Sequence, residues 1–209
     1  MRRLAEPVNP SLEMPMTHPI HLFFDTETTG IPRNYKAPVT DLRNWPRLVQ
    51  LAWLLTDAEG NEVSAAEHIV KPEGFTIPAD AARIHGITTE KALQSGIELR
   101  TALDEIVMGM NQASVLVAHN MAFDEKILGA ELLRAGQPDV VASKDRRCTM
   151  QASTSFCRLP GPYGYKWPTL QELHRKLFNE PFTGAHQALV DVRACARCYF
   201  ELRRLKVMR

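Results

Sequence analysis

Two acidic residues end an apolar run near the start of the chain, in the stretch HLFFDTETTG at residues 21–30. Asp25 and Glu27 lie two positions apart, and side chains alternate along a strand, so both should point to the same side. Neighbouring carboxylates repel one another unless a cation or a proton intervenes. They are therefore either ordinary charges at a solvent-facing strand end or oxygen ligands of a divalent cation.

Two later clusters each pair a histidine with an aspartate five positions further on. HNMAFD runs from His119 to Asp124, and HQALVD runs from His186 to Asp191. We expect the first cluster at the exit of a strand and the second at the opening of the final helix. Taken singly, each cluster is a weak signal. A histidine at a strand end usually forms a capping or other hydrogen bond, and aspartates favour the first turn of a helix.

In this order, DTETTG, HNMAFD and HQALVD resemble the three motifs of the DEDDh exonucleases. This family includes the proofreading epsilon subunit of bacterial DNA polymerase III, RNase T and the TREX enzymes. The resemblance extends over residues 20–202, and IHGIT at residues 84–88 also resembles a segment of the epsilon-like members. It implies an α/β protein with an RNase H-like fold, in which helices flank a five-stranded mixed sheet. It also implies a 3′–5′ exonuclease that releases nucleoside 5′-monophosphates.

The resemblance assigns catalytic roles residue by residue. Two divalent cations, Mg²⁺ or Mn²⁺, would be held by the carboxylates of Asp25, Glu27, Asp124 and Asp191, and His186 would be the general base. Two such cations can stabilise the attacking and leaving oxygens of an in-line displacement. A neutral histidine can accept a proton from water near neutral pH.

The two histidines are interpreted differently. His186 precedes the final helix, on a segment starting near Gly184 that could bring a base to the water only when substrate is bound. The alternative for His186 is a surface residue near a helix start. His119 is interpreted as a structural residue that orients the loop presenting Asp124.

Thr28, Thr29 and Gly30 are predicted to line the pocket for the terminal nucleotide. Glycine lets the backbone approach a ligand closely, and the family holds the 3′ end with backbone groups at this place. The alternative is an ordinary turn at the exit of the strand.

Two long irregular stretches, residues 31–46 and 157–168, interleave basic and aromatic side chains. Such a mixture suits phosphate contact combined with base stacking. In the first stretch Tyr35 and Trp45 are candidate substrate contacts, although Trp45 could equally pack the loop onto the body of the protein. The same alternatives apply to the second stretch, which carries Tyr163, Tyr165, Lys166 and Trp167.

Three functions fit these motifs. The first is an exonuclease acting on a single-stranded or frayed 3′ end of DNA, because DTETTG resembles the epsilon-like group. The second is an RNase T-like exoribonuclease that trims RNA, since one sequence does not reveal a 2′-hydroxyl sensor. The third is a non-catalytic, polymerase-accessory nucleic-acid-binding module, which should have lost a carboxylate or the histidine, whereas all five residues are present. Strand preference, association with a DNA polymerase in trans and the oligomeric state stay open.

Composition sets broad limits on the protein. Residues 1–18 are expected to form a poorly ordered lead-in, and residues 19–209 a single exonuclease domain. The formal net charge is +1, so a nucleic-acid-binding surface must concentrate its positive charge locally. No run of 18 apolar residues and no signal-peptide pattern is present, so we expect no membrane span and a cytoplasmic location.

The four cysteines are predicted to be free thiols. Cys195 and Cys198 form a CxxC, which raises a zinc alternative. However, Cys195 lies on an apolar stripe of the final helix and is interpreted as a small core residue, and two further zinc ligands at a convincing spacing are missing.

The expected elements place these motifs at strand ends and helix starts. The first strand is expected to start with the apolar residues at 20–24 and to lead past Asp25 and Glu27 into an exit turn at 28–30. Further strands are expected at residues 47–57, 62–71, 114–120 and 146–150. Helices are expected on both sides of Gly86, at 98–111, at 123–136, near 169–178 and at 187–206. Because the strands first form a meander and then alternate with helices, we predict one mixed sheet covered by helices.

Overall fold

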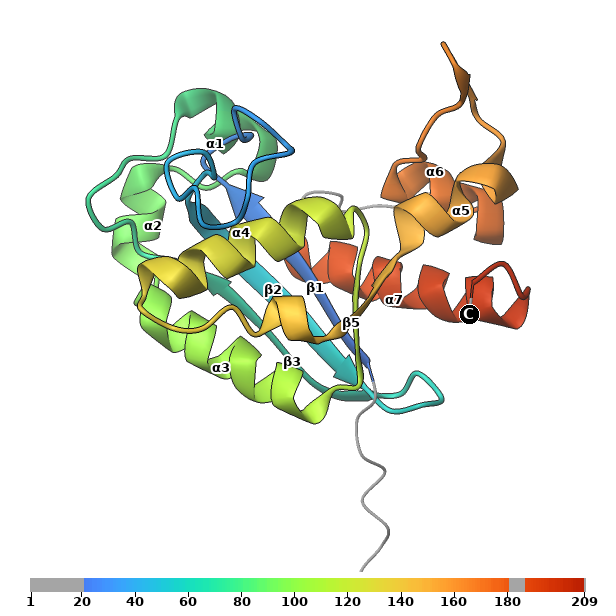
Figure 1. The fold of residues 1–209 in the computed structure, drawn as a ribbon, viewed down its shortest axis with the longest axis horizontal. Helices are drawn as coiled ribbons and strands as arrows, with labels where there is room; N and C mark the ends of the chain where they lie inside the picture. The colour runs from blue at the N-terminus through green and yellow to red at the C-terminus, as the bar shows by residue number, and fades with distance from the viewer. Residues whose placement is uncertain (1–20, 181–186, 209) are drawn as a thin grey trace, which may run out of the picture.

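A computed structural model describes residues 21–180 and 187–208, so the predicted lead-in and His186 lie outside the described residues. Five strands form one sheet in the order β3-β2-β1-β4-β5 (Figure 1). They are β1 (His21–Thr28), β2 (Leu48–Thr56), β3 (Glu62–Ile69), β4 (Val115–Ala118) and β5 (Asp145–Cys148). The β1–β2 and β2–β3 pairs are antiparallel, whereas β1–β4 and β4–β5 are parallel. The predicted five-stranded mixed sheet is confirmed.

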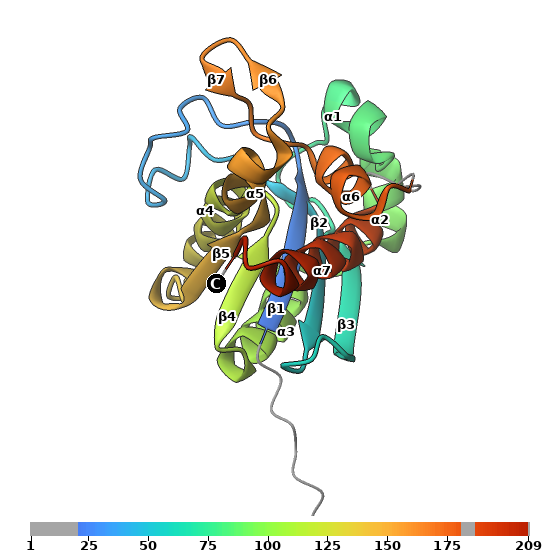
Figure 2. The ribbon, with the colours of Figure 1, turned by 90° about the vertical axis from the view of Figure 1, so that its right-hand side faces the viewer.

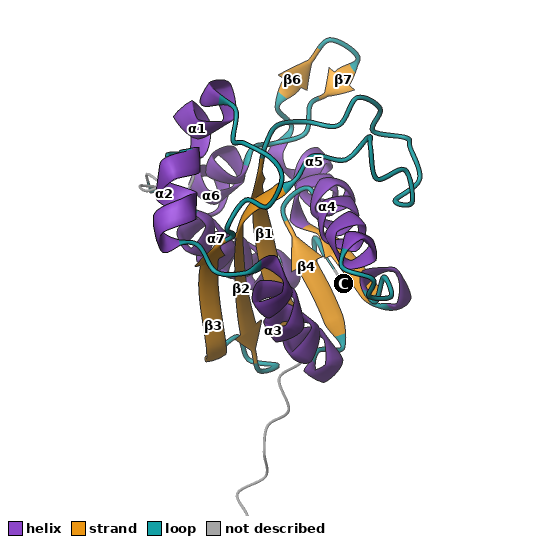
Figure 3. Ribbon diagram, turned by 90° about the vertical axis from the view of Figure 1, so that its left-hand side faces the viewer, coloured by secondary structure: helices purple, strands orange, loops and turns teal. Residues whose placement is uncertain are grey.

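Helices cover both faces of this sheet, with α7 on one face and α3 and α4 on the other (Figures 2 and 3). The helical segments are α1 (Ala79–His85), α2 (Thr89–Ser95), α3 (Leu99–Gln112), α4 (Met121–Arg134), η1 (Val141–Ser143), α5 (Thr149–Cys157), α6 (Leu170–Phe178) and α7 (Ala188–Arg204). No helix in the described ranges is both long and apolar enough to cross a membrane.

The central strand β1 is apolar on both faces because helices bury both of them. Leu22 and Phe24 pack with α3 and α4, whereas Phe23, between them, packs with α7. On the first face Gly109 of α3 permits a close approach, since a Cβ there would lie 2.7 Å from Leu22 Cδ1. This alternation continues past Phe24 and sends Asp25 to the face covered by α7.

Three elements differ from the sequence predictions. First, β1 includes Thr28, which was expected in the exit turn, and its pairing with β2 has a register shift between Glu27 and Thr28. Second, the strand expected at 146–150 ends at Cys148 and is followed by α5. The sequence TMQASTSFC of α5 is rich in small polar residues, two of which bond back to helix carbonyls, so it shows no strong apolar stripe. Third, the stretch 157–168 contains a small hairpin.

The cysteine predictions hold for the described structure. Cys148, Cys157, Cys195 and Cys198 are free thiols. Cys195 is buried among the apolar side chains between α7 and the sheet. The cluster of possible metal ligands found in the described residues consists of carboxylates and contains no cysteine, so zinc binding through CxxC gains no support.

Candidate active site

Three carboxylates meet where β1 ends and α7 begins. Asp25 and Glu27 of β1 and Asp191 in the first turn of α7 each offer an oxygen atom, and these atoms all lie within 4.8 Å of one another. The start of α7 is held against the sheet by Glu67 of β3, whose Oε1 accepts a hydrogen bond of 2.9 Å from the backbone N–H of Leu189. Strand alternation and one helix start thus bring together residues 166 positions apart in the sequence, from 25 to 191.

Asp124 supplies a fourth, buried carboxylate from the first turn of α4. Its Oδ1 accepts hydrogen bonds from the backbone N–H of Thr26, at 3.1 Å, and from the Thr26 hydroxyl, at 2.7 Å. The turn that leads from β4 into α4 uses Asn120 at φ 85°, a left-handed conformation that asparagine tolerates well. Asp124 is thereby fixed beside β1, and its charge acts on Asp25.

The four carboxylates disfavour one another's charge when no cation is present. Burial, followed by the charges of Asp124, Glu27 and Asp191, raises the pKa of Asp25 well above its usual value. Burial and the charge of Asp191 raise the pKa of Glu27 to about 7. Burial raises the pKa of Asp124 to about 7, against the opposing hydrogen bonds from Thr26. This set of crowded oxygen donors fits hard divalent cations such as Mg²⁺ or Mn²⁺, whose charge would offset the repulsion.

The pKa of Glu27 predicts how stability depends on pH without metal. A carboxyl whose folded-state pKa is raised from 4.5 to about 7 binds its proton more tightly in the folded state. Its stabilising contribution is therefore present below pH 4.5 and is lost as pH rises to about 7. We expect a loss of at most about 3 kcal/mol in the free energy of unfolding, since one pKa unit is worth about 1.4 kcal/mol.

Urea unfolding in EDTA at about pH 5 and about pH 8 measures this loss. The Glu27→Gln variant is the control, because it lacks the titrating group, and its stability should change less between the two pH values. Equal pH dependence in both proteins would contradict the assignment. Saturating Mn²⁺ should restore the stability of the wild type at the higher pH.

The imidazole of His119 forms hydrogen bonds to two other segments of the chain, and burial favours its neutral form. Its Nε2 lies 3.0 Å from the carbonyl oxygen of Pro168 and must carry the proton, so Nδ1 accepts from the Thr149 hydroxyl at 2.9 Å. Burial lowers the pKa of His119 to about 4. These contacts favour the structural interpretation. The partners, however, lie in α5 and in the segment before α6, not in the turn that presents Asp124.

The threonine hydroxyls at the end of β1 and in the turn after it are hydrogen-bonded to backbone groups of the protein. The Thr28 hydroxyl donates to the carbonyl of Gly30 at 2.6 Å, and the Thr29 hydroxyl accepts from the backbone N–H of Arg47 at 3.0 Å. Gly30 has φ 144°, which favours glycine. What this turn offers a ligand is therefore mainly backbone.

Of the two aromatic residues singled out in the 31–46 loop, one is exposed and one is not. Tyr35 is 60% exposed, whereas Trp45 is 3% exposed and its indole N–H donates to the carbonyl of Pro38 at 3.0 Å. The structure thus favours packing of the loop for Trp45. The suggested substrate contact of Trp45 is corrected, since a buried ring has no free face on which a base could stack.

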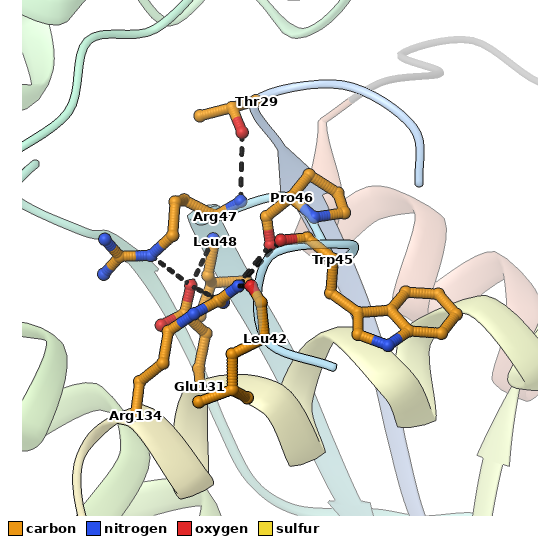
Figure 4. Close-up of polar contacts among 8 residues, drawn as sticks. All are labelled: Thr29, Leu42, Trp45, Pro46, Arg47, Leu48, Glu131 and Arg134. Carbon is orange, nitrogen blue, oxygen red and sulfur yellow. Dashed lines mark hydrogen bonds and ion pairs between the residues drawn. The ribbon is translucent and has the colours of Figure 1, made fainter. Parts of the chain in front are cut away.

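Sequence reasoning missed a buried ion cluster that anchors this loop (Figure 4). Glu131 of α4 is fully buried, and its Oε1 accepts from Arg47 Nε at 2.8 Å, from the Leu48 backbone N–H at 3.0 Å and from Arg134 at 2.9 Å. The Arg134 side chain also donates to the carbonyls of three loop residues, Leu42, Trp45 and Pro46. Because the backbones of Arg47 and Thr29 are hydrogen-bonded, the cluster also fixes the turn beside the carboxylates.

Removing the centre of this cluster should loosen both the loop and the turn. We expect Glu131→Ala to lower the free energy of unfolding by about 2–4 kcal/mol, because two arginines lose their buried partner. Thermal or urea unfolding measures the effect. The matched control is Asp104→Ala, which breaks the exposed Arg100–Asp104 pair and should cost less than about 1 kcal/mol. Similar losses in the two variants would contradict an anchoring role for Glu131.

A hollow of about 490 Å³ is lined by residues of β2 and β3 and by Gln187 at the start of α7. Gln50, on its wall, is the register partner of Glu27 across the β1–β2 pair, so their side chains share a face. His85, from the IHGIT segment, also lines it. The complete lining is Gln50, Glu67, Ile69, His85, Ile87, Lys91, Ser95 and Gln187. Its volume is in the range of small-ligand sites.

The family model for exonucleases, RNase_T, matches residues 22–199. No curated protein sequence matches the chain. Among solved structures, zinc-bound Escherichia coli exonuclease I in complex with single-stranded DNA is 21% identical, with a TM-score of 0.70 over 89% of this chain and 40% of that chain. Exonuclease I from Methylocaldum szegediense is 23% identical, with a TM-score of 0.68 over 88% of this chain and 40% of that chain.

The chain therefore spans about two fifths of these exonuclease I structures, whose similarity supports the fold. The family itself follows from the match over most of the sequence, which includes the predicted motifs at Asp25, Asp124 and Asp191. The acidic cluster lies where those motifs converge. The chain belongs to the exonuclease family, and the resemblance of its motifs to those of the DEDDh enzymes is confirmed at the level of the family.

Proposed function

We propose that residues 19–209 form a metal-dependent 3′–5′ exonuclease domain that hydrolyses DNA from an unpaired 3′ end and releases nucleoside 5′-monophosphates. The main support is the set of three carboxylates within 4.8 Å, with Asp124 beside it, in a chain of the exonuclease family. A cytoplasmic location stays a prediction from the sequence. The polymerase partner suggested by the resemblance to epsilon gains no support from the described residues.

Asp25, Glu27, Asp124 and Asp191 would hold the two cations. When bound, divalent cations supply positive charge that stabilises the attacking and leaving oxygens of a phosphodiester. The carboxylates fix the place of that charge at the end of β1. We assign the general base to His186, which directly precedes Gln187, the N-cap residue of α7, and therefore lies close in the sequence to Asp191 in the first turn of that helix. His186 would take the proton of the attacking water.

The hollow that Gln50 helps to line is our candidate for the terminal nucleotide. The hollow lies on the same face as Glu27, and its wall offers hydrogen-bonding groups from Gln50 and His85. The backbone of Thr28, Thr29 and Gly30 would contact the 3′ end from the neighbouring turn. Tyr35, which is exposed on the 31–46 loop, remains a candidate contact for substrate further from the scissile bond.

DNA is proposed as the substrate in preference to RNA. Two of the similar structures are exonuclease I bound to single-stranded DNA or to a dA16 oligonucleotide, the latter 20% identical with a TM-score of 0.70 over 90% of this chain and 42% of that chain. Those ligands belong to those proteins and support the proposal only through the shared fold. Digestion of matched DNA and RNA oligonucleotides decides between them, and faster RNA cleavage would favour the RNA-trimming alternative.

Polarity and end recognition give a direct test of the proposed function. Linear single-stranded DNA with a free 3′-hydroxyl should be degraded, whereas a closed circle should resist because it offers no end. A 3′-phosphate should also slow digestion, since extra negative charge would enter a site lined by carboxylates. Gel analysis of the three substrates with Mg²⁺ measures this. Rapid cutting of the circle would show an endonuclease instead.

A further inference from the structure

Three aromatic side chains are exposed together on the hairpin that follows α5. The hairpin consists of β6 (Pro160–Gly161) and β7 (Gly164–Tyr165). Tyr163 at its turn is fully exposed, Tyr165 is 54% exposed, and Trp167, just after it, is 61% exposed. Large aromatic rings contribute most of their binding energy when buried, so a cluster left in water is typical of a surface that meets a ligand.

The base of this hairpin is hydrogen-bonded to the end of the sheet at which the carboxylates lie. His119, at the exit of β4, binds the carbonyl of Pro168 at 3.0 Å, and the backbone N–H of Lys166 donates to Leu159 at 2.9 Å. The Thr169 cap then starts α6 at once. Figures 2 and 3 both show the hairpin projecting from the end of the molecule at which β1 ends. The exposed rings therefore stand on a fixed support at the same end as the carboxylate cluster.

The charges near these rings favour an anionic ligand. Residues 157–168 include Arg158 and Lys166 and no acidic residue, although Lys166 forms an ion pair with Glu172 at 2.6 Å. The 31–46 loop, at the same end of the molecule, carries three basic residues and one acidic residue. With a net charge of only +1 for the whole chain, this is a local concentration of positive charge.

We propose that Tyr163, Tyr165 and Trp167 form a stacking platform for unpaired bases of the nucleic acid on the 5′ side of the scissile phosphate. Aromatic rings interleaved with basic residues bind single strands with little sequence preference, because every base has a π face. A duplex does not fit this role, since its bases are already stacked and paired. The inference rests on the proposed exonuclease function and specifies its substrate as a single-stranded tail several nucleotides long.

Two substrates separate the platform from the active site. A ~20-nucleotide oligothymidylate reaches both, whereas the p-nitrophenyl ester of thymidine 5′-monophosphate reaches only the active site. We expect the triple variant Tyr163→Ala, Tyr165→Ala and Trp167→Ala to raise KM for the oligonucleotide on the order of 10- to 100-fold, from loss of stacked bases. The triple variant should hydrolyse the ester as fast as the wild type. The control Met108→Ala removes an exposed side chain from α3 and should match the wild type on both substrates.

Two outcomes of this comparison would contradict the platform. Equal losses on both substrates would show that the hairpin acts through the active site. Unchanged kinetics on both would mean that the rings bind something else, such as a protein partner. Within an otherwise wild-type chain, Trp167→Phe should keep the low KM because it retains an aromatic ring, whereas Trp167→Leu should raise it; an equal KM in the two variants would show that bulk alone suffices and would contradict stacking.

Tryptophan fluorescence tests binding independently of any activity. Trp167 is exposed, while the other two tryptophans, Trp45 and Trp53, are buried. In EDTA, oligothymidylate should quench the emission saturably, and Trp167→Phe should abolish the quenching. Absence of quenching in the wild type would overturn the platform. If quenching occurs but wild type hydrolyses neither substrate, the proposed function fails while the platform stands.

Discussion

Asp25→Ala is expected to reduce nuclease activity to below about one per cent of the wild type, because the central carboxylate of the cluster is lost. Asp25 lies within 4.8 Å of Glu27 and Asp191, and the charges of all three other carboxylates help to raise its pKa. Its removal should relieve like-charge repulsion, so the metal-free variant should be at least as stable as the wild type. Steady-state digestion of single-stranded DNA at saturating Mn²⁺, together with thermal unfolding in EDTA, measures both effects.

Two companion variants make this expectation specific. Asp25→Asn keeps the shape of the side chain and removes its charge, so it should be equally inactive. Asp104→Ala removes an exposed carboxylate from α3 and should keep full activity. Retention of more than a few per cent of wild-type turnover in Asp25→Ala would count decisively against the assignment of the cluster.

His186→Ala is expected to slow hydrolysis on the order of 10²–10⁴-fold, the range for loss of a general base. The variant should still bind metal, because the four carboxylates are unchanged. A base must be neutral to accept a proton, so wild-type activity should fall as pH drops through the pKa of His186, and this acid limb should disappear in the variant. The pH–rate profile is measured at saturating Mn²⁺, with saturation shown at each pH because carboxylates with pKa values of about 7 lose metal in acid.

His119→Ala provides the matched control for that experiment. Burial lowers the pKa of His119 to about 4, so it stays neutral throughout the working range and its loss should leave the acid limb unchanged. The variant should instead lower thermal stability, because the Thr149 and Pro168 contacts are lost. If His119→Ala proves the more damaging variant for turnover, the roles of the two histidines are reversed.

The motifs predicted the acidic cluster well because its positions follow from local geometry. Alternation along β1 puts Asp25 and Glu27 on one face, and the helix starts supply Asp124 and Asp191. Apolar patterning likewise predicted the sheet, since buried strands and amphipathic helices leave clear periodic signals. The role of His186 stays a prediction, because that residue lies outside the described structure.

What the sequence did not show depends on contacts between distant segments. Nothing in GAELLRAG distinguishes Glu131 from a solvent-facing helix residue, and only the fold brings Arg47 to it. The two alternatives for Trp45 also had equal support until its burial was seen, since an aromatic residue in a loop can either pack or stack. Helix α5 was missed because its stability comes from packing against α6 and α7 rather than from a strong apolar pattern of its own.

The most direct test of the central claim is the time course of a 5′-labelled, single-stranded DNA oligonucleotide digested by the wild-type protein. With Mg²⁺ or Mn²⁺ the label should pass through a ladder of products, each shorter by one nucleotide at the 3′ end, as expected for carboxylate-bound cations acting at a terminal phosphodiester. No product should form in EDTA or with Asp25→Ala. Cleavage in EDTA, or immediate release of the label as a mononucleotide, would contradict a metal-dependent 3′–5′ exonuclease.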